Sequence, residues 1–564
     1  MKQSLGHRIF PLSAANCVQV FVRFRNWSAS RPRLFRFVAP AVLFAILLAP
    51  SIWMLSAIPP LWRDVDAYLQ VTGAPGSETI LHYGPLYCFM ARIPLYFGFA
   101  IDCLKASAPL PNASFFVRPV LSDSGVLALV VLQHLGLGLA TFHFIATTTR
   151  SFWIRLTLIV VWAANPLFYT FAHCIGTETL SMILMLLIGA TGLRIVRNCR
   201  KISKKEWFLF CILLWLSILT RHINAALAGL LPLTMFLLAS YRVIRMRFAC
   251  RKLIRRWHWL LAAQNLEKAT FAVIAGILCI LLANGALRAI CYAAQTPYHS
   301  ALGFTFLFRL KFLAGLTAQE RNQLLKKVSR NSDSPDVKNV ISLLQRELPA
   351  GASSLDVGAF RKQLETSPSL SQMAVSGDTV DAALTHTAWA FLYPPQRVFL
   401  HAVAADFNRS QEITIPDVVR FLFVTTTFYF SHSASMPQFA SLITFRDKNA
   451  DEIFAIFKRR PYFHHPKNFN FRILLFFWLV SVAVFIRVAK IRKQAAAAAA
   501  SYAAALTLTG LLIMLVNCFL TVFQPRFTLP MWELTIMSVT ILLGAIMENL
   551  VSALPLFPRN RRRK

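Results

Sequence analysis

Residues 34–58 read LFRFVAPAVLFAILLAPSIWMLSAI, and residues 61–87 read LWRDVDAYLQVTGAPGSETILHYGPLY. The first stretch is predominantly apolar and is long enough to cross a bilayer as a helix. The second places two acids, Asp64 and Asp66, within a few residues of the end of that helix, and it closes on the element His82–Tyr87 after a turn-rich passage. Carboxylates held at a membrane surface are suited to proton transfer on a lipid-borne substrate. We therefore predict that this loop carries the functional site.

The composition of the chain indicates a membrane protein. Of its 564 residues, 56% are hydrophobic and 15% are charged, and the mean hydropathy is +0.54. A soluble protein of this length would expose more charge, so we predict an all-α polytopic membrane protein. The net charge of +35 could indicate a nucleic-acid partner, but the positions of the charges exclude that interpretation.

Lysine and arginine gather in short segments. Six segments hold 32 of the 59 Lys and Arg residues against two acids: residues 1–36, 148–155, 194–206, 242–268, 487–493 and 559–564. Residues 292–417, by contrast, hold 12 Lys and Arg and 11 Asp and Glu. Basic residues concentrated in alternate short loops are the positive-inside pattern. We therefore predict that these segments and both termini are cytoplasmic and that nucleic acid is not a partner. The predicted location is a bacterial inner membrane.

The apolar segments predict a bundle of about ten membrane-spanning helices. The predicted spans are residues 34–58, 125–146, 154–171, 177–195, 206–219, 223–241, 269–291, 473–486, 499–522 and 527–550. Asp123 or Ser124 is the expected cap of the second span. The basic segment 242–268 is expected to be a loop.

The first outer loop is predicted at residues 59–122. Its apolar part, Leu86–Leu104, is interrupted by charged residues such as Arg92, which would be costly at the middle of a bilayer, so we expect a helix lying at the interface. The ten cysteines have no CxxC pairs. Only Cys88 and Cys103 share an outer loop, which leaves a disulfide between them open.

A second outer region, residues 292–470, is too long for a connecting loop and nearly balanced in charge. We predict a small, mostly helical extracytoplasmic domain, seated on the membrane by interfacial helices at 301–316 and 418–430. The chain then divides into an N-terminal transmembrane module (1–291), this domain, and C-terminal transmembrane helices (471–564).

Asp64 and Asp66 admit two interpretations. In one, Asp64 caps a helix and Asp66 is solvated. In the other, a carboxylate at the outer surface accepts the proton of an attacking hydroxyl, and the pair helps to bind a divalent cation. No cofactor is certain from the sequence.

The order of these elements resembles that of the GT-C superfamily of integral membrane glycosyltransferases, which includes the aminoarabinose transferases of lipid A modification and the protein O-mannosyltransferases. Members have an acidic motif after the first span and then a Pro-Leu-Tyr-like element; here WRDVDAY and HYGPLYCF occupy those places. Residues 524–537, QPRFTLPMWELTIM, resemble the Arg-Tyr-x-x-Pro element of a late span. The usual Pro-Pro-Leu is replaced by Gly84-Pro85-Leu86. The resemblance implies that Asp66 is the catalytic base, with Asp64 as the second candidate.

Further candidate site residues lie at the outer ends of predicted spans. Glu178 either stabilises a helix N-terminus or, as the resemblance implies, faces a catalytic cavity. Arg526, Arg221 and Arg288 either extend to lipid head groups or bind a donor phosphate, for which a guanidinium is well shaped. His82, Tyr83 and Tyr87 are predicted substrate contacts, and His173 is predicted to be structural.

The resemblance implies a GT-C enzyme that transfers a sugar from a polyprenyl-phosphate donor to a hydroxyl of a glycan, lipid or protein acceptor. The transfer takes place on the extracytoplasmic side and inverts the anomeric centre. Alternatives are a transporter or flippase of lipid-linked sugars and a non-catalytic protein of the same fold. A transporter would need ionisable groups deep within its spans, and the predicted spans are almost free of charge.

Overall fold

The computed structural model describes residues 32–58, 60–62, 67, 71–73, 84–197, 204–247, 252–295, 298, 301–349, 352, 354–367, 379–422, 469–488 and 494–553. Its α-helices are α2 (Pro32–Ala57), α5 (Pro85–Lys105), α6 (Asp123–Thr148), α7 (Phe152–Ala163), α8 (Pro166–His173), α9 (Thr177–Arg197), α10 (Lys204–Thr220), α11 (Leu230–Arg247), α12 (Lys252–Ala293), α13 (Ala301–Arg309), α14 (Ala318–Arg330), α15 (Pro335–Glu347), α16 (Val357–Thr366), α18 (Thr379–Leu392), α19 (Arg397–Glu412), α22 (Phe471–Val488), α23 (Gln494–Leu520) and α24 (Leu529–Ala553). The 3-10 helices are η1 (Ala113–Phe116), η2 (His222–Gly229), η3 (Leu310–Gly315) and η7 (Pro525–Thr528), and the strands are β1 (Leu61–Trp62) and β2 (Cys174–Ile175).

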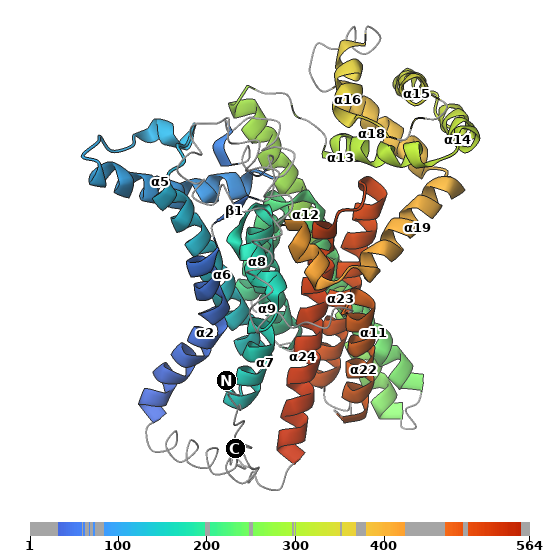
Figure 1. Ribbon diagram of the computed structural model, residues 1–564. Helices are drawn as coiled ribbons and strands as arrows, with labels where there is room; N and C mark the ends of the chain where they lie inside the picture. The colour runs from blue at the N-terminus through green and yellow to red at the C-terminus, as the bar shows by residue number, and fades with distance from the viewer. Residues whose placement is uncertain are drawn as a thin grey trace, which may run out of the picture.

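The long helices form a bundle (Figure 1). Within the described part of the chain, nine helices are long and apolar enough to cross a membrane, or ten if the bent pair α7–α8 counts as one span. The protein is an all-α, multi-pass integral membrane protein, as the sequence predicts. These helices differ from the predicted spans in two places. Helix α5 also has the length and composition of a span, whereas α10, with 17 residues, is short for one.

Helix α5 lies across one end of the bundle instead of along it (Figure 1), as expected of an interfacial helix. Arg92 is fully buried and donates hydrogen bonds to the carbonyl oxygens of Gly73 and Phe116, so its charge joins residue 73 and the 3-10 helix η1 to α5. Cys88 and Cys103 are free thiols. They lie near opposite ends of α5, about 20 Å apart at 1.5 Å per residue, which is far beyond the reach of a disulfide.

The span predicted at residues 154–171 is not one helix. Helix α7 ends at Ala163, and α8 begins at Pro166 after a bend of 60°. Pro166 has no N–H to continue the helical hydrogen bonds, and it disfavours helical backbone at Asn165. The Asn165 side chain instead accepts a hydrogen bond from the Leu167 N–H at 3.0 Å and caps α8. Every residue of α8 is buried.

The connections around α11 also differ from their prediction. The sequence predicts a loop over 242–268, but α11 continues to Arg247 and α12 begins at Lys252. That segment contains no Gly or Pro and is rich in good helix formers. The span predicted from Ile223 begins as the 3-10 helix η2 and becomes α-helical only at Leu230.

The cap of α6 is Ser122, and the prediction of Asp123 or Ser124 was wrong. The Ser122 hydroxyl accepts a hydrogen bond from the Gly125 N–H at 3.1 Å. Ser124 instead donates from its N–H and its hydroxyl to the carboxylate of Asp102, at 3.2 and 2.5 Å. This carboxylate therefore joins the end of α5 to the start of α6.

Helices α13 to α18 gather beyond one end of the bundle (Figure 1). Helices α14 and α15 belong to this unit. Helix α14 opens with a capping box, in which the Thr317 hydroxyl accepts from the Glu320 N–H and the Glu320 carboxylate accepts from the Thr317 N–H. Hydrogen bonds from Thr317 hold the pKa of Glu320 below its usual range.

A buried arginine ties this helical unit to the bundle. The helix predicted at 301–316 is α13 continued by η3, whereas the one predicted at 418–430 lies partly outside the described residues. Arg309, at the end of α13, forms an ion pair with Asp406 of α19 and donates to the carbonyl oxygen of Thr521 at 3.5 Å. Its side chain is 1% exposed.

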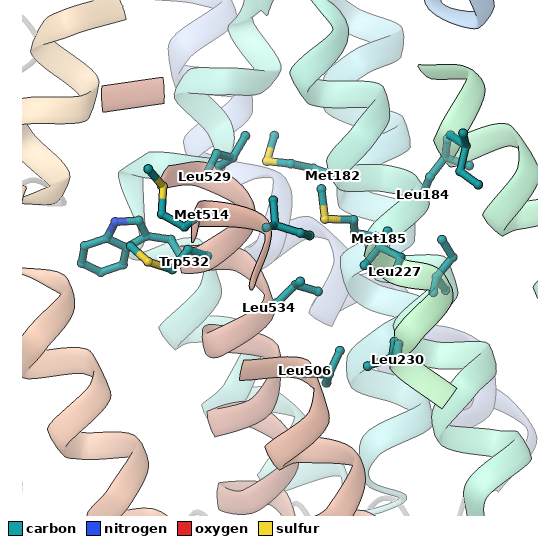
Figure 2. Close-up of a cluster of buried hydrophobic side chains, with 14 of the residues drawn as sticks. Met182, Leu184, Met185, Leu227, Leu230, Leu506, Met514, Leu529, Trp532 and Leu534 are labelled. Atoms are coloured by element: carbon teal, nitrogen blue, oxygen red, sulfur yellow. The ribbon is translucent and has the colours of Figure 1, made fainter. Parts of the chain in front are cut away.

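Buried apolar side chains of α9, η2, α11, α23 and α24 meet in the interior of the bundle (Figure 2). Met182 and Met185 lie on α9, Leu227 on η2, and Leu529 and Trp532 on α24. All five are almost completely buried. Close packing of this kind fixes the starts of η2 and α24, and two of the predicted site residues, Arg221 and Arg526, lie just before these starts.

Candidate functional site

A cavity of about 530 Å³ is lined by residues from three distant parts of the sequence: 221–226, 302–308 and 516–527. Its polar side chains are Arg221, His222, Thr305, Asn517, Thr521, Gln524 and Arg526. The rest of the wall is apolar, with aromatic rings from Phe304, Phe308 and Phe527. A mainly apolar wall with a few convergent polar groups is typical of a ligand site.

Arg221 occupies the junction between α10 and η2. Its backbone is extended (φ −152°, ψ 124°), which ends α10 at Thr220 and places Arg221 at the cavity wall. Its Nη1 lies 3.7 Å from Oε1 of Glu178 in the first turn of α9, and the two side chains are 13% and 3% exposed. Among the described residues that line the cavity, Glu178 is absent. Glu178 is therefore placed to orient Arg221 and to offset part of its charge.

Arg526 lies in η7, just before α24 begins. It is 7% exposed, and its guanidinium carbon lies 5.4 Å from the centre of the Phe527 ring. A cation over an aromatic face is held in place electrostatically. Arg526 and Arg221, two of the predicted phosphate ligands, thus line one cavity. Among the described residues, Arg221, Arg526 and Glu178 give this site an excess of positive charge, which favours an anionic ligand.

A short parallel pairing holds residues 61–62, which precede the predicted catalytic acids in the sequence, beside residues 174–175, which precede Glu178. In β1 and β2, Leu61 pairs with Cys174 and Trp62 with Ile175. Trp62 is two residues before Asp64 in the sequence, and its partner Ile175 is three residues before Glu178. Neither the composition nor the spacing of the sequence indicates this pairing, because the two strands have two residues each.

Gly84 lies against the backbone of Leu219 and Thr220, the two residues before Arg221. Its φ is +103°, a conformation that other residues rarely adopt. A Cβ at this position would lie 2.5 Å from the carbonyl oxygen of Leu219 and 2.6 Å from that of Thr220. Only glycine allows this approach.

The remaining predicted residues are not brought to this cavity by the described structure. Asp64, Asp66, His82 and Tyr83 lie outside the described residues, and the divalent cation predicted at the two acids lies outside them too. In the part of the chain that is described, no three His, Cys, Asp or Glu side chains gather as a metal site. Arg288 is exposed, with its guanidinium carbon 5.3 Å from the centre of the Tyr298 ring.

Tyr87 is buried in a hydrogen-bond network. Its hydroxyl donates to Gln133 Oε1 at 2.7 Å and accepts from the Gly176 N–H at 3.1 Å. Gln133 Nε2 in turn donates to the carbonyl oxygens of Ala172 and Cys174. Tyr87 therefore positions the turn that precedes Glu178.

Several cavity residues were missed at the sequence level. Asn517 could have been predicted to face a polar space, because an amide within an apolar span is otherwise costly. Gln524 directly precedes the Pro525–Phe527 element. No signal in the sequence indicated Thr305 or Phe308 of α13, because their contribution depends on how the helical unit sits against α23.

The span interiors also contain ionisable groups, contrary to the sequence interpretation. Glu533, near the start of α24, is fully buried, and neither carboxyl oxygen has a hydrogen-bond partner among the described residues. His134 Nε2 lies 3.2 Å from His173 Nδ1. His173 Nε2 is 2.9 Å from the carbonyl oxygen of Ile58, which gives His173 the structural role that was predicted.

Comparison with known families and curated proteins found no match. Among solved structures, the chain is similar to the archaeal oligosaccharyltransferase AglB from Archaeoglobus fulgidus, solved in complex with an inhibitory peptide and a dolichol-phosphate. The identity is 12% and the TM-score 0.35, and the alignment covers 93% of this chain and 53% of that one. The chain thus spans about half the length of that protein.

Proposed function

We propose that the chain is a GT-C-type membrane glycosyltransferase that transfers a sugar from a polyprenyl-phosphate donor to an acceptor hydroxyl. The reaction takes place at the end of the bundle that holds the 530 Å³ cavity. In this proposal that end is extracytoplasmic, the membrane is a bacterial inner membrane, and both termini are cytoplasmic. The domain at residues 292–470 selects the glycan, lipid or protein acceptor.

The observation that carries the proposal is the convergence of Arg221 and Arg526 on one cavity, beside the buried Glu178. A lipid-linked sugar phosphate presents an anion, several hydroxyls and an apolar chain. The cavity offers a counterpart for each: guanidinium groups, side-chain amides such as Asn517 and Gln524, and aromatic walls.

Each residue has a defined role in the transfer. Asp66 accepts the proton of the acceptor hydroxyl as its oxygen bonds to the anomeric carbon. The bond from that carbon to the phosphate oxygen breaks, and its electron pair leaves with the polyprenyl phosphate. Arg526 and Arg221 stabilise the charge of the leaving phosphate, and Glu178 is a positioning residue for Arg221. Direct attack without a covalent intermediate inverts the anomeric centre.

The test is a transfer assay on purified protein in lipid vesicles, with a panel of radiolabelled polyprenyl-phosphate sugars and acceptors of the three classes. We expect transfer from at least one donor, and a loss of about 10²-fold or more in Asp66→Asn. Asp333→Asn, which changes an exposed acid of the helical unit, should retain full activity. Full activity in a folded Asp66→Asn protein would remove the assignment of the base.

Glu533 favours the alternative of a transporter or flippase, because an acid buried within a span is a common feature of transport pathways. The two functions are distinguished by measuring movement of a fluorescent lipid-linked sugar across vesicles that contain no acceptor. Movement that is abolished by Glu533→Gln, with no transfer in the panel assay, would establish transport instead of catalysis.

A further inference from the structure

A second cavity, of about 460 Å³, lies at the opposite end of the bundle. Glu178 and Arg197 mark the two ends of α9, a helix of 21 residues that is about 30 Å long. The second cavity is lined by residues 146–150, Arg194, Arg197 and Glu548. Three guanidinium groups therefore face one carboxylate, in a space that the proposed transfer reaction does not use.

Part of this positive charge is explained by the end of α6. Arg197 donates from Nη1 and Nη2 to the carbonyl oxygens of Thr147 and Thr148, at 2.7 and 2.9 Å. Arg155 donates in the same way to Ala146 and Thr149, at 3.1 and 2.8 Å. Both cations satisfy carbonyl groups that a helix C-terminus leaves without partners.

Arg150 and Arg194, the other two arginines that line this cavity, have side-chain N–H donors that are not used in hydrogen bonds among the described residues. Arg150 is exposed, and only its backbone N–H binds Glu548, at 3.2 Å. Arg194 makes one long hydrogen bond, from Nη2 to Thr191 Oγ1 at 3.4 Å, and its buried Nε has no partner among the described residues. A guanidinium carries five N–H donors. Glu548 is meanwhile engaged by the Thr149 hydroxyl at 2.5 Å and forms no ion pair with the three arginines in the described structure.

We propose that this cavity binds a phosphate-bearing anion, with Arg150 and Arg194 as its principal ligands and Arg197 as a supporting charge. This cavity is separated from the first by the length of one membrane-spanning helix, which places it at the level of lipid head groups. Basic pockets between transmembrane helices bind anionic head groups, and the same donors would bind a soluble phosphate compound. The shared chemistry is a phosphate held by forked N–H groups.

Binding is measured on delipidated full-length protein in neutral detergent, by thermal shift and by native mass spectrometry. One arm adds phosphatidylglycerol, with phosphatidylcholine as its zwitterionic control, and the other adds inorganic phosphate or pyrophosphate. Stabilisation by phosphatidylglycerol alone identifies a lipid head group. Stabilisation by the soluble anions alone identifies a soluble ligand. Binding of neither probe to the wild-type protein overturns the proposal.

The variants separate this cavity from general surface charge. Arg150→Gln removes an exposed side chain and should preserve folding, while it weakens, about tenfold, the binding of the probe that stabilises the wild-type protein. Arg194→Gln should weaken binding of the same probe at least as much. Arg487→Gln, an exposed arginine near the end of α22 that does not line the cavity, is the matched control and should bind as the wild type does. Unchanged binding in folded Arg150→Gln and Arg194→Gln proteins would refute the assignment.

Discussion

The two ends of the bundle each hold a cavity lined by arginine, but the walls of these cavities differ. The cavity near α13 combines two guanidinium groups with aromatic rings and amides, and one of its arginines is already paired with a buried acid at 3.7 Å. The cavity at the far end is lined by threonine, alanine, three arginines and one glutamate, without an aromatic ring among its described residues. The first suits an amphiphilic ligand with an anionic group, and the second suits the anionic group alone. The same type of side chain therefore indicates different ligands, depending on what surrounds it.

The largest expected effect is on the transfer rate, when Arg526 is removed from the first cavity. Arg526→Gln should lower the transfer rate about 10²–10³-fold, because a preorganised donor to the developing phosphate charge is lost. The measurement is the initial rate with the best donor of the panel. Arg288→Gln, an exposed arginine outside the cavity, should leave the rate unchanged. Equal losses in both variants would show that overall charge, and not the cavity, controls the rate.

A smaller but still large effect is expected from Arg309→Met, which leaves Asp406 without its partner. Breaking a buried ion pair costs about 3–5 kcal/mol; since Asp406 is 22% exposed, we expect about 2–3 kcal/mol. The melting temperature and the transfer rate should both fall. Phosphate binding at the far cavity should persist at temperatures where the bundle is folded. The double variant Arg309→Met/Asp406→Leu should recover much of the stability, which a purely steric role of Arg309 would not allow.

Gly84→Ala tests whether the close approach of the loop to α10 maintains the first cavity. A residue forced into a positive φ costs about 1–3 kcal/mol, and the added Cβ would also press on the carbonyl groups before Arg221. We expect about a tenfold loss of transfer activity. Gly285→Ala is the matched control, because a Cβ there meets nothing within 4 Å. Comparable losses at both glycines would argue against a specific role of this approach.

The smallest expected effect is a gain at the far cavity. Glu548→Gln removes the acid that faces the three arginines, while its amide oxygen can still accept a hydrogen bond from Thr149. Anion affinity should rise about threefold, as is usual for a partly exposed charge, and transfer should not change. The affinity is measured by titration of the anion that stabilises the wild-type protein. A fall in affinity would contradict the inference that Glu548 and the three arginines face the same bound anion.

The sequence predicted the fold better than it predicted the site. The lengths of apolar segments gave the helical bundle, because the bilayer imposes them. The bend at Asn165 could have been predicted from the proline that follows, since Pro166 disrupts a helix by a local steric effect. The 3-10 turns after Arg221 had no comparable local signal.

The site depended on contacts between distant segments. Arg221 and Arg526 were selected as boundary arginines, but nothing in the sequence showed that they share one cavity. Arg150 and Arg194 were interpreted only as part of the positive-inside pattern. That pattern is explained equally well by solvated charges, and a cavity becomes evident only when α6, α9 and α24 are placed together.

The three-part wall of the first cavity has a consequence for biosynthesis. Segment 516–527 follows Arg221 by about 300 residues, so a nascent chain has one guanidinium group in place long before it has the other. Domains that emerge early fold while translation continues. A premature stop between Arg221 and Gln524 therefore leaves out Gln524, Arg526 and Phe527, which form one side of this cavity. Such a product would keep the earlier helices and Arg221 but would lack Arg526 and its part of the cavity wall.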